Sequence, residues 1–175
     1  MKQFVMLFTG ISGSGKSTLA NAVADALRKN GTAVSIIDGD DSRRLVGNIF
    51  GHSKEERIKM GSVNRMAGHY LIDSGISVLY ALVCPYEEIR EQFREFFGEY
   101  YIEVYVKADQ KLCARRDVKG LYSLCEQGKL EHFNGTNDTF EEPCNSDIVI
   151  DTETENVSYA VNKIMNYLTE RGYVI

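Results

Sequence analysis

Nine residues near the start of the chain have the types and spacing of a phosphate-binding loop. They run Gly10-Ile11-Ser12-Gly13-Ser14-Gly15-Lys16-Ser17-Thr18, and the first eight fit the pattern G-x-x-x-x-G-K-[ST]. Small residues let the backbone curl so that successive N–H groups point at phosphate oxygens. Lys16 would then reach the β- and γ-phosphates, and the Ser17 hydroxyl would ligate Mg²⁺. The motif predicts binding of a nucleoside triphosphate, with these residues at the phosphates: Gly10, Ser12, Gly13, Ser14, Gly15, Lys16, Ser17 and Thr18.

The segments on either side of the loop have the patterns that the motif requires. Residues 4–8 form an apolar run of strand type, and residues 18–27 carry the pattern of a helix. A helix that starts at the loop adds the positive end of its dipole to the phosphate site. A glycine-rich turn without a ligand is the alternative interpretation, and the complete motif between a strand and a helix argues against it.

Two acidic residues follow the next predicted strand. Residues 33–37 are a short apolar run, and Asp38 and Asp40 come directly after it. Strand, helix and strand with a short return form a βαβ unit, so the sheet is predicted to be parallel. Ligands bind beyond the carboxyl ends of parallel strands. Both carboxylates are therefore candidates for Mg²⁺ coordination or for taking a proton, with a plain polar turn as the alternative.

Four arginines lie in the helical region that follows. Helical patterns cover residues 41–46 and 53–73, and the second starts with a capping box, Ser53-Lys54-Glu55-Glu56. The arginines are Arg43, Arg44, Arg57 and Arg65. Guanidinium groups beside a nucleotide-binding edge are typical of an anion pocket. Solvent-exposed helix faces are an equally good interpretation of any single one.

The rest of the chain completes an α/β pattern. Further strands are predicted at residues 76–83, 101–106 and 147–150, and helices at 87–97 and 157–168. Together these elements predict one domain over residues 1–175, with a parallel sheet of about five strands flanked by helices. From about residue 113 to residue 145 the pattern is interrupted by glycine, asparagine and proline, which is typical of a lid. Its cations Arg115, Arg116 and Lys119 would close over the phosphates.

Composition limits the classes of partner. The chain has 175 residues, of which 43% are hydrophobic and 26% charged, and its net charge of −5 without a large basic block argues against polymeric nucleic acid. No apolar run reaches the roughly 18 residues of a membrane helix, and the N-terminus lacks a signal-peptide pattern. The four cysteines form no C-x-x-C pair. A cytoplasmic protein with reduced cysteines and no membrane partner is therefore expected.

Several further stretches occur in the order found in one family. The chain resembles adenylyl-sulfate kinases (APS kinases) over nearly its whole length. Besides the phosphate loop, the matching stretches are Asp38-Gly39-Asp40 with Arg43, Ser53 to Arg57, Pro85-Tyr86 with Arg90 and Arg94, Arg116-Asp117-Val118-Lys119-Gly120-Leu121-Tyr122, Phe133-Asn134-Gly135 and Phe140-Glu141-Glu142-Pro143. The phosphate loop is shared by many folds, whereas the R-D-x-K-G-L-Y segment at this distance from D-G-D is far more specific.

The resemblance implies a P-loop kinase fold and an activity. The γ-phosphoryl group of ATP would pass to the ribose 3′-hydroxyl of adenosine 5′-phosphosulfate (APS), with Mg²⁺ as cofactor. Asp38 would take the hydroxyl proton and, with Ser17, place the Mg²⁺ ion. Lys16 would share the catalytic role, and Arg116 would bind ATP from the lid.

The same resemblance implies a site for the acceptor nucleotide. Arg43 and Arg57 would hold its anionic groups, Phe133 would stack on its base, and Lys119 would belong to the lid. The complete set of implied acceptor residues is Asp40, Arg43, Phe50, Arg57, Met60, Cys84, Lys119, Leu121 and Phe133. Relatives are commonly dimers, so a homodimer is also expected.

The departures from the family pattern fall on the acceptor side. Met60 stands where the family has an asparagine, and residues 61–63 lack the arginines that follow it in the family. His52 replaces a phenylalanine, and Glu126 replaces an arginine of the lid. Cys84 replaces a serine proposed to carry phosphate, which favours direct in-line transfer. Because a lost hydrogen bond changes which base a site accepts, the same reaction on another nucleotide is the alternative, for example on cytidine diphosphoramidate in capsule biosynthesis. A nucleotide-binding module without catalysis is the second alternative.

Overall fold

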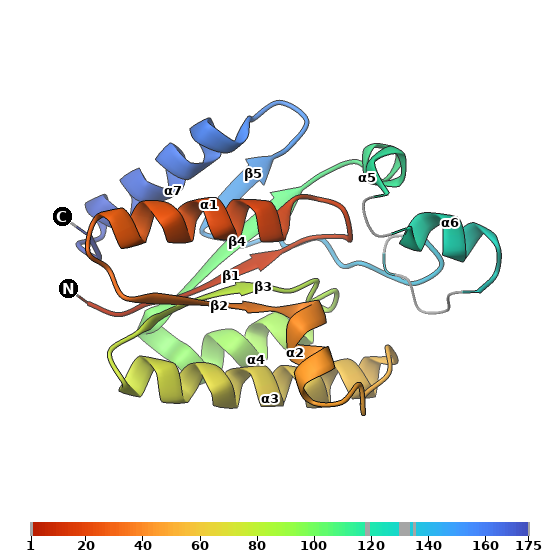
Figure 1. Ribbon diagram of the computed structural model, residues 1–175, viewed down its shortest axis with the longest axis horizontal. Coiled ribbons are helices and arrows are strands. Elements are labelled where there is room, and N and C mark those ends of the chain that lie inside the picture. The colour runs from red at the N-terminus through yellow and green to blue at the C-terminus, as the bar shows by residue number, and fades with distance from the viewer. Residues whose placement is uncertain (1, 118–119, 130–133, 135, 175) are drawn as a thin grey trace.

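A computed structural model describes residues 2–117, 120–129, 134 and 136–174 of the chain. Within these residues the chain forms a sheet of five parallel strands in the order β2-β3-β1-β4-β5 (Figure 1). The strands are β1 (Val5–Thr9), β2 (Val34–Asp38), β3 (Ser77–Ala81), β4 (Tyr101–Lys107) and β5 (Ile148–Asp151). The predicted α/β fold with a five-stranded parallel sheet is therefore confirmed.

Helices cover both faces of this sheet (Figure 1). The longer ones are α1 (Lys16–Lys29), α3 (Lys54–Asp73), α4 (Glu87–Phe97) and α7 (Val157–Glu170). Helices α1 and α7 lie on one face, and α3 and α4 lie on the other. The first strand contributes to both layers, because successive side chains of a strand point to opposite faces. Met6 and Phe8 pack with α1 and α7, whereas Val5 and Leu7 pack on the side of α4.

The shorter elements lie mainly at one edge of the sheet. They are α2 (Gly39–Leu45), the 3₁₀ turn η1 (Gly98–Tyr100), α5 (Gln110–Arg116) and α6 (Leu121–Glu126). Helices α2, α5 and α6 lie near the carboxyl ends of the strands, where the loop between β1 and α1 also turns (Figure 1). No helix among the described residues has the length and apolar character needed to cross a membrane.

Local capping explains two of the helix starts. The predicted capping box of α3 is present, because the backbone N–H of Glu56 donates to the Ser53 hydroxyl and the backbone N–H of Ser53 donates to the Glu56 carboxylate. Helix α2 begins at Gly39, earlier than predicted. The cause is Asp38, whose side chain accepts a hydrogen bond from the backbone N–H of Asp40 and so caps the helix.

Candidate active site

A cavity of about 710 Å³ opens at the carboxyl edge of the sheet. Part of its wall comes from the phosphate loop with the start of α1, from the end of α5 and from the segment between β5 and α7. We call this part the loop half, and it consists of residues 12–19, Arg116, Thr152 and Asn156. Another part comes from α2, α3 and the segment after β3, and we call it the arginine half: Arg43, His52, Arg57, Met60, Asn64 and Cys84. Asp38 also lines the cavity, so segments that lie far apart in the sequence share one site.

The phosphate loop is held in shape by close backbone packing. A Cβ atom on Gly10 would lie 2.4 Å from the carbonyl oxygen of Val106, so only glycine fits there. Gly15 has a φ of +105° and a Cβ there would be strained as well. The Lys16 ammonium group is buried and donates to the carbonyl oxygen of Ile11 across the loop at 2.8 Å. The loop therefore presents its curled backbone and the lysine to the cavity.

Asp38 links the loop to the rest of the cavity. One carboxylate oxygen accepts the hydrogen bond that caps α2, and the other accepts a hydrogen bond from the Ser17 hydroxyl at 2.5 Å. Asp38 therefore lies directly beside the phosphate loop, and its roles as metal ligand and base stay predictions. Asp40 lines the same cavity and is exposed. A hydroxyl and a carboxylate in contact give the oxygen donors that a hard divalent cation prefers.

Two half-buried arginines organise the opposite wall. Arg43 donates to the carbonyl oxygens of Phe50 and Gly51 at 3.0 and 2.8 Å, and Arg57 donates to the carbonyl oxygen of His52 at 2.8 Å. The loop between α2 and α3 therefore wraps around both guanidinium groups, which hold it through its carbonyl oxygens. Burial lowers the pKa of both groups, and the charge of Arg43 lowers the pKa of Arg57 further. The negative charge of a bound anion would offset this repulsion and the cost of desolvation, so the two arginines are suited to hold an anion.

The remaining predicted acceptor residues differ in where they lie. Met60 is buried, and it lines the cavity together with Cys84 and Leu121. Phe50 does not line the cavity, and its carbonyl oxygen is the atom that Arg43 contacts. Lys119 and Phe133 lie outside the described residues, so their roles stay predictions.

Arg116 joins the predicted lid to the loop half. It lies at the end of α5 and donates to the carbonyl oxygen of Gly13 at 3.3 Å. It also donates to the hydroxyl and the carbonyl oxygen of Thr152, at 3.4 and 3.2 Å. Nearby, the Tyr122 hydroxyl donates to the carbonyl oxygen of Ser12 at 2.9 Å. Arg116 therefore lies beside the phosphate loop, and its role in binding ATP stays a prediction.

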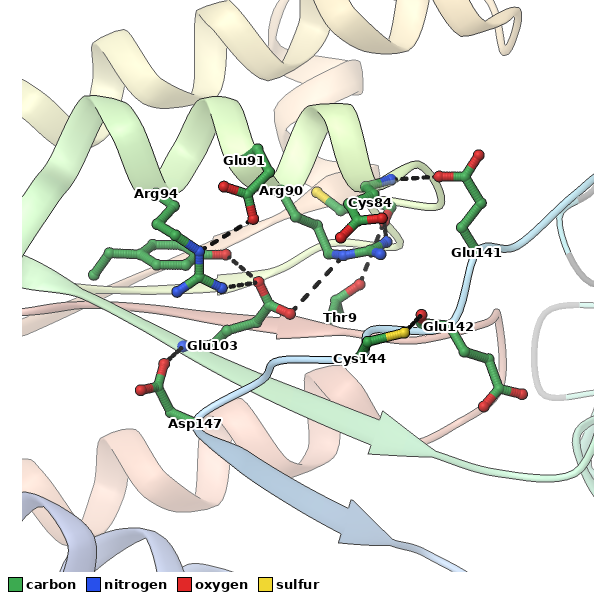
Figure 2. Close-up of polar contacts among 12 residues, drawn as sticks. Thr9, Cys84, Arg90, Glu91, Arg94, Glu103, Glu141, Glu142, Cys144 and Asp147 are labelled. Carbon is green, nitrogen blue, oxygen red and sulfur yellow. Dashed lines mark hydrogen bonds and ion pairs between the residues drawn. The ribbon is translucent and has the colours of Figure 1, made fainter.

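Cys84 lies at a strained position that buried charges support (Figure 2). Its φ of +39° is uncommon for a residue with a side chain. The fully buried Arg90 of α4 donates to the Cys84 carbonyl oxygen at 2.9 Å, and the Arg90 Nε lies 3.9 Å from the Glu103 carboxylate. Glu103 also accepts from Tyr101 and Arg94, at 2.8 and 3.2 Å. Burial is the main cause that raises the pKa of Glu103.

The sequence did not single out several residues that line the cavity. Thr152 and Asn156 follow the last strand and contribute to the loop half. The rule that ligands bind beyond the carboxyl ends of parallel strands was a usable signal for both. Asn64 lines the cavity too, although its side chain is almost fully buried. No sequence pattern marked Asn64, which lies inside a long helix.

The fold and the loop define the class of protein. A parallel sheet with a phosphate loop between its central strand and a helix is the architecture of P-loop kinases. Within that class, the family model described as adenylylsulphate kinase matches residues 2–151. The chain belongs to the adenylyl-sulfate kinase family.

Individual relatives agree with this membership. An adenylyl-sulfate kinase of Picosynechococcus is 37% identical over 95% of this chain and 94% of that protein. One of Prochlorococcus marinus is 38% identical over 99% of this chain and 87% of that protein. Among solved structures, the Mycobacterium tuberculosis APS kinase in complex with AMPPNP and APS superposes with a TM-score of 0.91 at 28% identity, covering 96% of this chain and 98% of that one.

Proposed function

We propose that this chain is an ATP-dependent kinase that transfers the γ-phosphoryl group of ATP to the ribose 3′-hydroxyl of APS, giving 3′-phosphoadenosine 5′-phosphosulfate. One observation carries the proposal: a single cavity holds a phosphate loop and a pair of half-buried arginines, with Asp38 in the same wall. The mycobacterial structure, which contains an ATP analogue together with APS, supports this pairing of ligands.

Each half of the cavity has a distinct task in this reaction. The loop and Lys16 would hold the phosphates of ATP, and Arg116 would cover them from the lid segment, residues 113–145. Arg43 and Arg57 would hold the anionic 5′ group of the acceptor. Asp38 would accept the proton of the 3′-hydroxyl as that oxygen attacks the γ-phosphorus. Catalysis of this kind rests on positioning and on charge neutralisation rather than on a covalent intermediate.

Mg²⁺ fits the oxygen atoms beside the loop. The Ser17 hydroxyl and the Asp38 carboxylate contact each other, and proteins commonly hold Mg²⁺ with one or two such groups together with the phosphates of the substrate. We propose that these two residues hold the ion. When bound, it would neutralise charge on the β- and γ-phosphates.

The test is turnover with purified substrates. The protein is mixed with Mg-ATP and APS, and the release of ADP is followed. We expect ADP release that depends on APS and stops when EDTA removes the metal ion. Absence of ADP release with every nucleotide acceptor tried would overturn the proposal of a kinase.

A second acceptor is favoured by one observation. Met60, which is buried and lines the arginine half, puts a thioether where the family pattern has an amide. The alternative is the same reaction on cytidine diphosphoramidate. Turnover with the cytidine compound but not with APS would establish this alternative and exclude the first acceptor.

Self-association also belongs to the proposal. A hexameric APS kinase from Thiobacillus denitrificans shares the fold with a TM-score of 0.74 at 25% identity, and this chain covers 30% of that one. We propose that the present chain forms a homodimer, which light scattering at catalytic concentrations tests.

A further inference from the structure

An exposed patch of large side chains lies on the outer face of α3. Met66 and Tyr70 are 54% and 65% exposed and lie one helical turn apart, and His69 is exposed beside them. Phe96 of α4 is 51% exposed, and its ring centroid lies 6.0 Å from that of His69 in an edge-to-face arrangement. We call these four side chains the α3 patch. Exposed apolar side chains that gather in this way, rather than singly, mark interaction surfaces.

The α3 patch lies away from the candidate active site. The residues of α3 that line the cavity are Arg57, Met60, Gly61 and Asn64. At 3.6 residues per turn these four share one face of the helix, and Met66 and Tyr70 lie on the opposite face. Helix α3 forms an outer edge of the molecule (Figure 1). A partner that covers the α3 patch would therefore leave the cavity open.

The exposed residues before and after Met66 on this face of α3 are complementary. Lys59 lies seven residues before Met66 and Asp73 lies seven residues after it, and both are exposed. Ser62 and Tyr70 lie four residues before and after Met66, and both are exposed as well. Each position on one side of Met66 thus has a counterpart at the same distance on the other side. A cation is matched by a carboxylate, and a small side chain by a large one.

This symmetry is what a surface needs in order to fit a second copy of itself. In a twofold interface both copies use the same patch, so the patch must be complementary to itself. When two α3 helices cross antiparallel with Met66 at the twofold axis, positions equally far before and after Met66 face each other. Lys59 of one copy then meets Asp73 of the second copy. Tyr70 lies over Ser62 of the second copy, whose small side chain leaves room for the ring.

From these observations we propose that two copies of this chain associate through the α3 patch, with their α3 helices antiparallel about Met66. The proposal rests on the proposed self-association, and it names the surface and the register of that contact. Met66, Tyr70 and Phe96 form the apolar centre of the interface. The two Lys59–Asp73 pairs lie at its rim, where charges fix orientation more than they add affinity. Within one copy the Asp73 carboxylate lies 3.5 Å from the His69 Nε2 atom, at the edge of the patch.

Sedimentation equilibrium of the purified protein tests the surface. Met66→Glu places two like charges against each other at the axis, so the dissociation constant of the dimer should rise by roughly 100-fold. Tyr159→Glu is the matched control, because Tyr159 is 58% exposed on α7, which covers the other face of the sheet. It should leave the constant unchanged, and circular dichroism shows that both variants are folded. A dimer that resists Met66→Glu would overturn this surface, and a monomeric unmodified protein would overturn self-association as a whole.

Charge reversal tests the antiparallel register. Lys59→Glu and Asp73→Lys each turn both rim pairs into repulsions, and each should raise the dissociation constant by roughly 10-fold. The variant with both substitutions restores the attraction, so its constant should return to within about threefold of that of the unmodified protein. Single variants without effect, or a double variant without recovery, would overturn the register. ADP release is measured on the same unmodified protein, so failure of the proposed reaction and failure of this interface give different results.

Discussion

The two halves of the cavity are built in different ways. The loop half is largely one continuous stretch of backbone, whose curl depends on glycines at positions such as Gly10 and Gly15. The arginine half is made of side chains from two helices and the segment after β3, and its carbonyl contacts come from the loop that Arg43 and Arg57 fold around themselves. A substitution changes the backbone geometry of the loop half little, whereas in the arginine half it changes the contacting groups themselves. The phosphate donor is therefore fixed by the fold, and the acceptor is set residue by residue.

Asp38 joins the halves, so its substitution should have the largest effect. Asp38→Asn keeps an oxygen that caps α2 but removes the base, and we expect kcat to fall by roughly 10²- to 10⁴-fold, as for loss of a general base. Binding of ATP should stay close to normal. Initial rates of ADP release and equilibrium binding of an ATP analogue measure the two effects. A variant that keeps more than a tenth of the rate would show that Asp38 is not the base.

Substitution of Arg57 should change the KM for the acceptor without changing the KM for ATP. Arg57→Met removes a charge that we place on the acceptor's 5′ group, so the KM for the acceptor should rise by roughly 10- to 100-fold while the KM for ATP stays unchanged. Arg44→Met is the matched control, because Arg44 is exposed, pairs with Asp41 and does not line the cavity. If both variants behave alike, Arg57 makes no specific contact with the acceptor.

Two arginines that share Glu103 should differ in effect (Figure 2). Arg90 supports the Cys84 carbonyl and Arg94 does not, although both approach the Glu103 carboxylate. We expect Arg90→Lys to lower kcat/KM for the acceptor by about 10-fold, the size of one lost hydrogen bond, and to leave the KM for ATP unchanged. Arg94→Lys should stay close to the unmodified protein. Equal losses in the two variants would mean that the pair supports stability alone, which thermal unfolding would show.

The thiols should show the smallest effect. Burial raises the pKa of Cys84 to about 12, so this thiol is protonated at pH 8 and becomes a thiolate only as the pH rises toward that value. Cys144 is exposed. Alkylation with iodoacetamide at pH 8, followed by mass spectrometry, should modify Cys144 and spare both Cys84 and the activity. Faster modification of Cys84 would contradict its burial in the arginine half.

The same contrast explains what the sequence could predict. The phosphate loop is a local pattern, and the place of Asp38 follows from the parallel sheet, so both were accessible from residue order alone. The residue pattern by itself did not distinguish Arg43 and Arg57 from exposed arginines such as Arg44, and only the family resemblance singled these two out. Only packing shows which side chain points inward.

Asn64 was missed for a physical reason that does not apply to Thr152 and Asn156. Asn64 belongs to the site because Tyr80 and Gly68 bring α3 close to β3, a tertiary contact that no pattern within α3 records. Phe50 is the opposite case. It was expected to contact the acceptor, but it does not line the cavity, and its carbonyl oxygen accepts a hydrogen bond from Arg43. Depth within a cavity depends on how elements pack, and spacing along the chain does not encode it.

The most direct test of the account is the structure of the reaction product. The protein is incubated with Mg-ATP and APS, and the nucleotide product is examined by ³¹P NMR with coupling to the ribose protons. The account predicts one ADP for each APS consumed, with the new phosphate on the 3′-oxygen and coupled to the proton on that carbon. A phosphate on any other atom, or ATP hydrolysis without phosphorylation of a nucleotide acceptor, would contradict it.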